Sequence, residues 1–182
     1  SDRDCQTSHR TVTIPGLINV SSLVPNITNV VDGPSELKEV TRLSVESGFT
    51  YSQILPLSRS GPVLTDSINL KAAESIVQDS AYTDFSLTLA GTSNNINEIA
   101  NVADRVNALF LSSRELSGKI SVVSELLKNW PVEKQIIADA KTSDLASVIL
   151  LASLQNRSIH ITSVSNKEDL ALIKTVKEQH QN

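Results

Sequence analysis

Six apolar, β-rich runs alternate with six helical patterns along this chain of 182 residues, and this alternation constrains the fold more than any motif does. Strands that alternate with helices predict a parallel sheet with the helices outside it, so the predicted fold class is α/β. The predicted strands cover residues 11–23, 49–57, 85–90, 106–112, 134–140 and 158–164. The predicted helices cover residues 34–47, 66–80, 96–105, 115–129, 143–156 and 166–181.

Two architectures fit this pattern, an open doubly wound sheet and part of a (β/α)8 barrel of the TIM type. A complete barrel takes about 250 residues, so the predicted units leave it about two short of closure. We expect residues 1–10 to be a polar leader or linker and residues 11–182 to form the partial barrel domain. The chain contains no Met, so we expect Ser1 not to be the natural start but a point within a longer polypeptide.

The charge balance excludes two classes of partner. Lys and Arg number 16 against 20 Asp and Glu, which gives a formal net charge of −4. Nucleic acids and anionic membrane surfaces bind basic patches, so we expect neither as a partner. No apolar run reaches the roughly 18 residues of a membrane span, and no secretion signal opens the chain. The sequence therefore predicts a cytoplasmic location, where Cys5 would remain a reduced surface thiol.

The scarcity of reactive side chains limits the chemistry. The chain has three His and one Cys, and the histidines at positions 9, 160 and 180 lie too far apart for a short-range metal motif. No phosphate-binding loop, dinucleotide-binding glycine motif or nucleophile elbow is present. We interpret His160, inside an apolar run, as a hydrogen-bonded core imidazole rather than a metal ligand.

Five segments together carry a resemblance to a known family. They read TIPGLINVSSLVPNIT, SGFTYSQILPLSRSGP, DFSLTLAGTSNN, IIADAK and NRSIHITSVSNKEDLALIK. They resemble the dihydroorotases and related amidohydrolases. The resemblance is colinear from residue 12 to about residue 178, and it is closest to the dihydroorotase domains of multifunctional pyrimidine-synthesis proteins. It implies a (β/α)8 barrel with a binuclear zinc site at the carboxyl ends of its strands.

This chain departs from the family pattern at every ligand position that the resemblance assigns. The family uses two His after strand one, a carboxylated Lys on strand four and one His each on strands five and six. Neither Ser, Leu nor Ala can replace imidazole or carbamate on zinc, and a single Asp is not a zinc site. The five positions hold Ser21, Leu23, Ala108, Asp139 and Ser163, and two substrate-binding positions hold Pro25 and Leu57.

The resemblance therefore implies an inactive, metal-free dihydroorotase-like domain of the form found in fungal multifunctional proteins. Its implied role is that of a spacer between carbamoyl-phosphate synthetase and aspartate transcarbamoylase parts of the same polypeptide, which would supply the catalysis. Because an unclosed barrel leaves its first and last strands unpaired, we also expect a homo-oligomer.

Two other functions remain open from the sequence. The fold could have kept a pocket for an anion or a pyrimidine precursor, in which Arg59 would hold the anion near the end of the second strand. Alternatively, the chain could be a metal-independent enzyme with a doubly wound fold.

Overall fold

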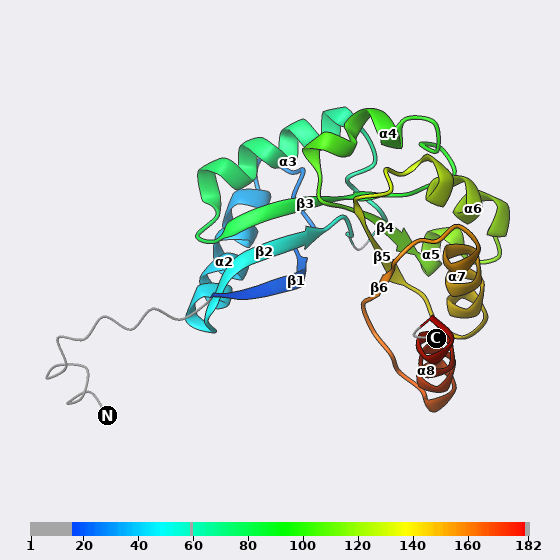
Figure 1. The fold of residues 1–182 in the computed structure, drawn as a ribbon. Helices are drawn as coiled ribbons and strands as arrows, with labels where there is room; N and C mark the ends of the chain where they lie inside the picture. Colours follow the sequence, from blue (N-terminus) through cyan, green and yellow to red (C-terminus); the bar gives the residue numbers. More distant parts are fainter. Residues whose placement is uncertain (1–15, 59, 181–182) are drawn as a thin grey trace, which may run out of the picture.

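Six parallel strands form one sheet in the computed structural model, which describes residues 16–58 and 60–180. They lie side by side in sequence order (Figure 1), whereas a doubly wound sheet reverses its order at a switch point. The doubly wound alternative is therefore wrong, and the α/β half-barrel is confirmed. The strands are β1 (Leu17–Leu23), β2 (Phe49–Leu55), β3 (Asp84–Ala90), β4 (Ala108–Ser112), β5 (Gln135–Asp139) and β6 (His160–Ile161).

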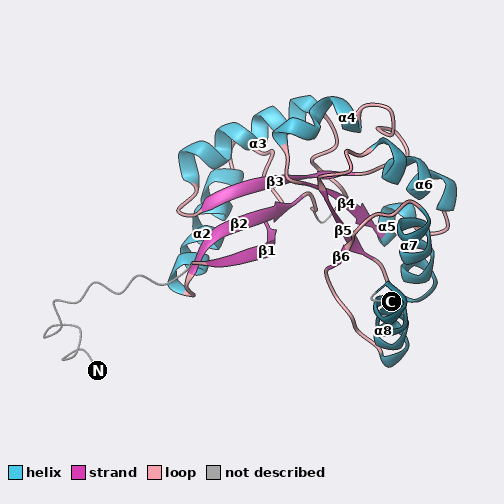
Figure 2. Ribbon diagram, in the orientation of Figure 1, coloured by secondary structure: helices cyan, strands magenta, loops and turns pink. Residues whose placement is uncertain are grey.

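The helices lie around the outside of the curved sheet (Figure 2), as expected for connections between parallel strands. They are α2 (Gly33–Glu46), α3 (Ser67–Ser80), α4 (Ile99–Val102), the 3-10 helix η1 (Ala103–Arg105), α5 (Ser113–Leu116), α6 (Ile120–Asn129), α7 (Thr142–Leu154) and α8 (Lys167–His180). None of the helices in the described ranges is long and apolar enough to cross a bilayer.

The sheet buries apolar side chains on both faces, because alternate residues of a strand point to opposite sides. On the outer face, strand residues such as Ile54 and Leu109 pack with helix residues such as Leu70 and Leu126, and all four are fully buried. A second, smaller cluster occupies the inner face, which is the face that lines the half-barrel. We call it the inner cluster; it consists of Leu55, Ala108, Phe110 and Ile137, with the half-buried Leu57 packed against it.

Three predicted element boundaries were wrong. The helix predicted over residues 115–129 is two helices, α5 and α6, separated at Gly118, whose φ of +71° favours glycine. Helix α7 covers Thr142–Leu154 rather than residues 143–156, and Lys141 at its N-cap position makes no side-chain capping hydrogen bond. The sixth strand, predicted over residues 158–164, pairs with its single neighbour β5 over only two residues.

Two apolar helix residues lie outside the buried faces of their helices. Leu43 of α2 and Ile68 of α3 are 48% and 79% exposed. On α2 the buried positions include Thr41 and Ser44, whose hydroxyls donate to the carbonyls of Leu37 and Val40 within the helix. These hydroxyls can be buried because the helix backbone satisfies them.

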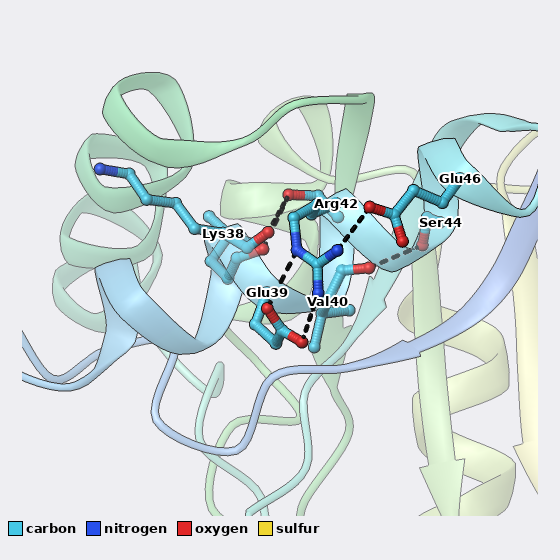
Figure 3. Close-up of polar contacts among 8 residues, drawn as sticks. Lys38, Glu39, Val40, Arg42, Ser44 and Glu46 are labelled. Carbon is cyan, nitrogen blue, oxygen red and sulfur yellow. Dashed lines mark hydrogen bonds and ion pairs between the residues drawn. The ribbon is translucent and has the colours of Figure 1, made fainter.

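The outward side of α2 carries a cluster of ion pairs. Figure 3 shows the Arg42 guanidinium between Glu39 and Glu46, and its Nη2 lies 2.8 Å from Glu39 Oε1. The hydrogen bonds with Glu39 and Glu46 raise the pKa of Arg42 above its usual value, and the bond with Glu39 has the largest effect. All three side chains are exposed, so the cluster is a solvated helix surface and contributes little to stability.

Candidate functional site

The carboxyl ends of the strands form the rim where a barrel of this type places its reactive groups. Pairing registers place Leu23 of β1 opposite Leu55 of β2, and Ser112 of β4 opposite Asp139 of β5. The rim formed by these strand ends thus presents the Asp139 carboxylate beside the Ser112 hydroxyl of β4. On β1 and β2 it presents the apolar pair Leu23 and Leu55.

Asp139 and Ser163 are the two predicted ligand positions that the structure brings together. The Ser163 hydroxyl donates to Asp139 Oδ1 over 3.5 Å, which is longer than an ordinary hydrogen bond. Asp139 is half-buried and Ser163 is exposed. Across the described residues, no three His, Cys, Asp or Glu side chains are grouped so that they could hold a metal ion.

His160 does not supply a base for the Ser163 hydroxyl. It pairs with Ile137, two residues before Asp139 along β5, and therefore lies deeper in the half-barrel than the rim. It is half-buried on the edge strand, so the expectation that the core encloses it was wrong. Nucleophilic catalysis by a serine needs a base within hydrogen-bonding reach, and Ser163 instead contacts a carboxylate at long range.

Ala108 lies on the inner face at the first position of β4, opposite Thr88 of β3 and Gln135 of β5. It is fully buried and belongs to the inner cluster. Its methyl group offers no ligand atom, and the cluster members Phe110 and Ile137 surround it with apolar groups. A charged or metal-bound group at this position would have to displace them.

The two predicted substrate positions are also apolar. Leu57 packs against the inner cluster from the segment after β2, and Pro25 is half-buried just after β1. Ser21 lies in β1 where the register with β2 is irregular, and its side chain is outside the description. Arg59, the predicted anion contact, lies outside the described residues. Its role stays a prediction.

The sequence interpretation missed a set of polar side chains on the inner face. Gln53 of β2 donates to Gln135 of β5 over 3.4 Å. The hydroxyls of Ser86 and Thr88 on β3 are buried and have no hydrogen-bond partner among the described residues. The alternation of β3, with Ser and Thr between leucines, contained the signal. Such neutral groups can bind water or orient a neighbour, but without a base they supply no hydrolytic chemistry.

Comparison with known proteins finds long multifunctional polypeptides. The chain is 66% identical over 177 residues to Multifunctional protein URA2 of Saccharomyces cerevisiae, covering 97% of this chain and 8% of that protein. It is 38% identical to Multifunctional protein pyrABCN of Emericella nidulans, again over 8% of the relative. No protein-family model matches the chain.

A solved structure gives the decisive match. The inactive dihydroorotase-like domain of the Chaetomium thermophilum CAD-like multifunctional protein superposes with a TM-score of 0.84 at 38% identity, over 94% of this chain. The chain belongs to the dihydroorotase-like domains of CAD-like multifunctional proteins. This dihydroorotase-like domain sequence spans 51% of the Chaetomium structure and 8% of the multifunctional relatives.

A more distant likeness concerns the fold alone. The L-hydantoinase of Arthrobacter aurescens superposes with a TM-score of 0.67 at 16% identity, over 92% of this chain and 45% of that one. The half-barrel thus matches the strand arrangement of amidohydrolase barrels, whereas its rim residues have to be judged from this chain itself.

Proposed function

We propose that this dihydroorotase-like domain is catalytically inert and acts as a structural spacer within a multifunctional pyrimidine-synthesis polypeptide. The observation that carries the proposal is the composition of the rim, where Asp139 contacts the Ser163 hydroxyl and no group of three ligand-type side chains lies among the described residues. Ala108, at the position that the resemblance assigns to a metal-bound lysine, is buried in the apolar inner cluster at the other end of β4. The likeness to a relative described as inactive supports the same conclusion.

Hydrolysis of a cyclic amide at neutral pH needs an activated water and a group that polarises the carbonyl. In this superfamily both tasks depend on bound metal ions, which lower the pKa of a coordinated water and withdraw charge from the carbonyl oxygen. At the rim of this domain, Asp139 is the carboxylate, and its contact in the described chain is the Ser163 hydroxyl. One carboxylate and one hydroxyl provide neither a tetrahedral zinc site nor an activated nucleophile.

The partners follow from the kind of polypeptide in which the relatives occur. We propose that the flanking parts are a carbamoyl-phosphate synthetase and an aspartate transcarbamoylase, that the parent polypeptide is an enzyme through these parts, and that it is cytoplasmic. The edge strands β1 and β6 each have one neighbour in the described sheet. Exposed edges favour pairing with other segments, so we propose that this chain on its own self-associates.

The spacer role can be tested in the parent polypeptide by replacing this domain with a flexible Gly/Ser linker of similar reach. We expect both flanking activities to be retained, because the domain supplies no chemical step, and the assembly mass in sedimentation to change. An unchanged assembly would contradict the spacer role, and loss of one chemical step would contradict the proposal of an inert domain.

The ligand-binding alternative predicts a different result. A retained pocket would make the melting temperature rise saturably with ligand, since a ligand that binds only the folded state stabilises it. We expect no such rise with dihydroorotate, carbamoyl aspartate, UTP or phosphate. A saturable rise that Arg59→Ala abolishes would replace the spacer proposal with an anion-binding one.

A further inference from the structure

Thr142 has an unusual backbone conformation at the start of α7. Its φ of +51° lies in the left-handed region, which β-branched residues rarely adopt. The residue follows β5 closely, three positions after Asp139 at the rim. A conformation of this kind persists only where neighbouring groups impose it, so the contacts of Thr142 identify what holds the loop.

Asp169, in the first turn of α8, makes that contact. Its carboxylate is buried, with the residue 2% exposed. Oδ1 accepts the Thr142 backbone N–H at 2.9 Å, and Oδ2 accepts Asn166 Nδ2 at 2.8 Å. Asn166 Oδ1 in turn accepts the Asp169 backbone N–H at 2.6 Å. One hydrogen bond, from the Thr142 backbone, therefore joins the start of α8 to the loop that leaves β5, and two reciprocal bonds with Asn166 hold the Asp169 carboxylate in place for it.

The rest of α8 is less closely attached. An open groove of about 530 Å³ lies between α7, β6 and α8, lined by apolar side chains that include Ile149, Ile161 and Ile173. The strand that leads into α8 pairs over only two residues. Figure 1 shows α8 beside α7, at the end of the sheet farthest from β1. The first turn of α8 is thus better anchored than its second half.

We propose that Asp169 is a clasp that fixes α8 to the body of the domain and holds Thr142 in its left-handed conformation. When the clasp is lost, α8 and the start of α7 each open locally and independently while the layers around α2 and α3 stay folded. Local opening of elements with few buried apolar contacts is common in native proteins. This conformational device is independent of whether the domain is inert.

Hydrogen exchange of the whole chain, read segment by segment, tests the clasp in Asp169→Ala. A hydrogen bond to a charged group corresponds to about tenfold or more in an opening equilibrium, so we expect exchange in residues 141–145 and 167–180 to accelerate by about that factor. Residues of α2 and α3 should be unaffected. The matched control is Glu168→Ala, which removes an exposed carboxylate from the same helical turn and should leave all segments unchanged.

A second pair of variants separates the clasp from general destabilisation. Thr142→Gly keeps the backbone donor but removes the cost of the positive φ. In an Asp169→Ala background it should slow the exchange of residues 141–145 again without slowing that of α8. If Asp169→Ala does not fold, Asp169→Asn replaces it. The amide oxygen of the new side chain can accept from only one of the two donors, Thr142 N–H or Asn166 Nδ2, and its NH2 group then faces the other donor.

Uniform acceleration in all segments, including α2 and α3, would overturn the proposal and make Asp169 an ordinary stabilising residue. Exchange in α8 equal to that of the Glu168→Ala control would overturn it as well. So would equal rescue of α8 and residues 141–145 by Thr142→Gly.

Discussion

Ala108 offers a direct test of the inner face, because a lysine there would enter the inner cluster. The residue is fully buried and packs with Leu55, Phe110 and Ile137. If the position resembled a ligand site, it would accept a long polar side chain at little cost. If it is a dry apolar position, Ala108→Lys must either bury an ammonium group or disrupt the packing.

The size of the effect follows from the burial. Full burial lowers the pKa of a lysine by up to about 3–5 units. Each unit corresponds to about 1.36 kcal/mol, so a buried charged lysine would cost about 4–7 kcal/mol. Because the side chain can instead lose its proton, the cost at pH 7 is limited to about 4.6 kcal/mol, the free energy of deprotonating a lysine with the ordinary pKa of about 10.4. We expect about 4 kcal/mol, because the open side of the half-barrel lets part of the side chain reach water. For a domain of this size that corresponds to a melting temperature lower by about 8–16 °C.

Urea denaturation and thermal melting of the two proteins measure this difference, with Ala146→Lys as the matched control. Ala146 is exposed on α7, so its variant should stay within about 0.5 kcal/mol of the original chain. Because only the charged lysine is penalised, its folded pKa is lowered, and the deficit should shrink as the pH rises toward the ordinary value of about 10.4. An Ala108→Lys variant as stable as the Ala146→Lys control would refute the description of the inner face.

Three further substitutions test the surrounding structure by the same melts. The Arg157 guanidinium donates to three carbonyls at the end of α6 over 2.7–2.8 Å, and burial lowers its pKa. Arg157→Ala should cost about 2–4 kcal/mol, and Arg157→Lys should recover only part, since an ammonium group lacks the planar fork. Asp66→Ala should cost about 1 kcal/mol, because Asp66 caps α3. Burial raises the pKa of Asp66, but hydrogen bonds, first from the Asn69 backbone, outweigh it and lower the pKa overall. The ionised cap therefore stabilises the folded state at pH values above the unfolded Asp pKa of about 3.9, and this stabilisation is lost as the pH falls through the lower folded pKa. The loss in unfolding free energy caused by Asp66→Ala should therefore become smaller between pH 7 and pH 2. Arg105→Ala, which breaks the partly exposed pair with Glu74, should cost less than about 1 kcal/mol; a larger loss would contradict our description of it as a surface ion pair.

The elements of the half-barrel were predictable because each strand and helix has its own hydrophobic period. Most elements begin and end within two residues of the predicted positions; these are β2, β3, β4, β5, α2, α3, α7 and α8. The lengths of the sixth strand and of the helices predicted over residues 96–105 and 115–129 depended on context. The sixth apolar run could have formed a long strand, but at the edge of the sheet it pairs over two residues. The break at Gly118 was visible as a residue type, although nothing nearby in the sequence indicated a positive φ.

The site was predictable in residue identity but not in spatial arrangement. Resemblance alone indicated that Asp139 and Ser163 occupy neighbouring strand ends, and the structure places their side chains 3.5 Å apart. The apolar surroundings of Ala108 depend on three other strands and could not be derived from its own segment. The contact between Thr142 and Asp169 spans 27 residues and uses a backbone donor, which leaves no signal in the sequence.

We propose that the rim of this half-barrel holds no metal and catalyses no ring hydrolysis. Zinc content by mass spectrometry, measured together with dihydroorotase turnover after incubation with excess zinc, tests it most directly. We predict substoichiometric zinc after dialysis and no turnover above a metal-free control. Stoichiometric zinc that survives dialysis, or turnover above that control, would contradict the account.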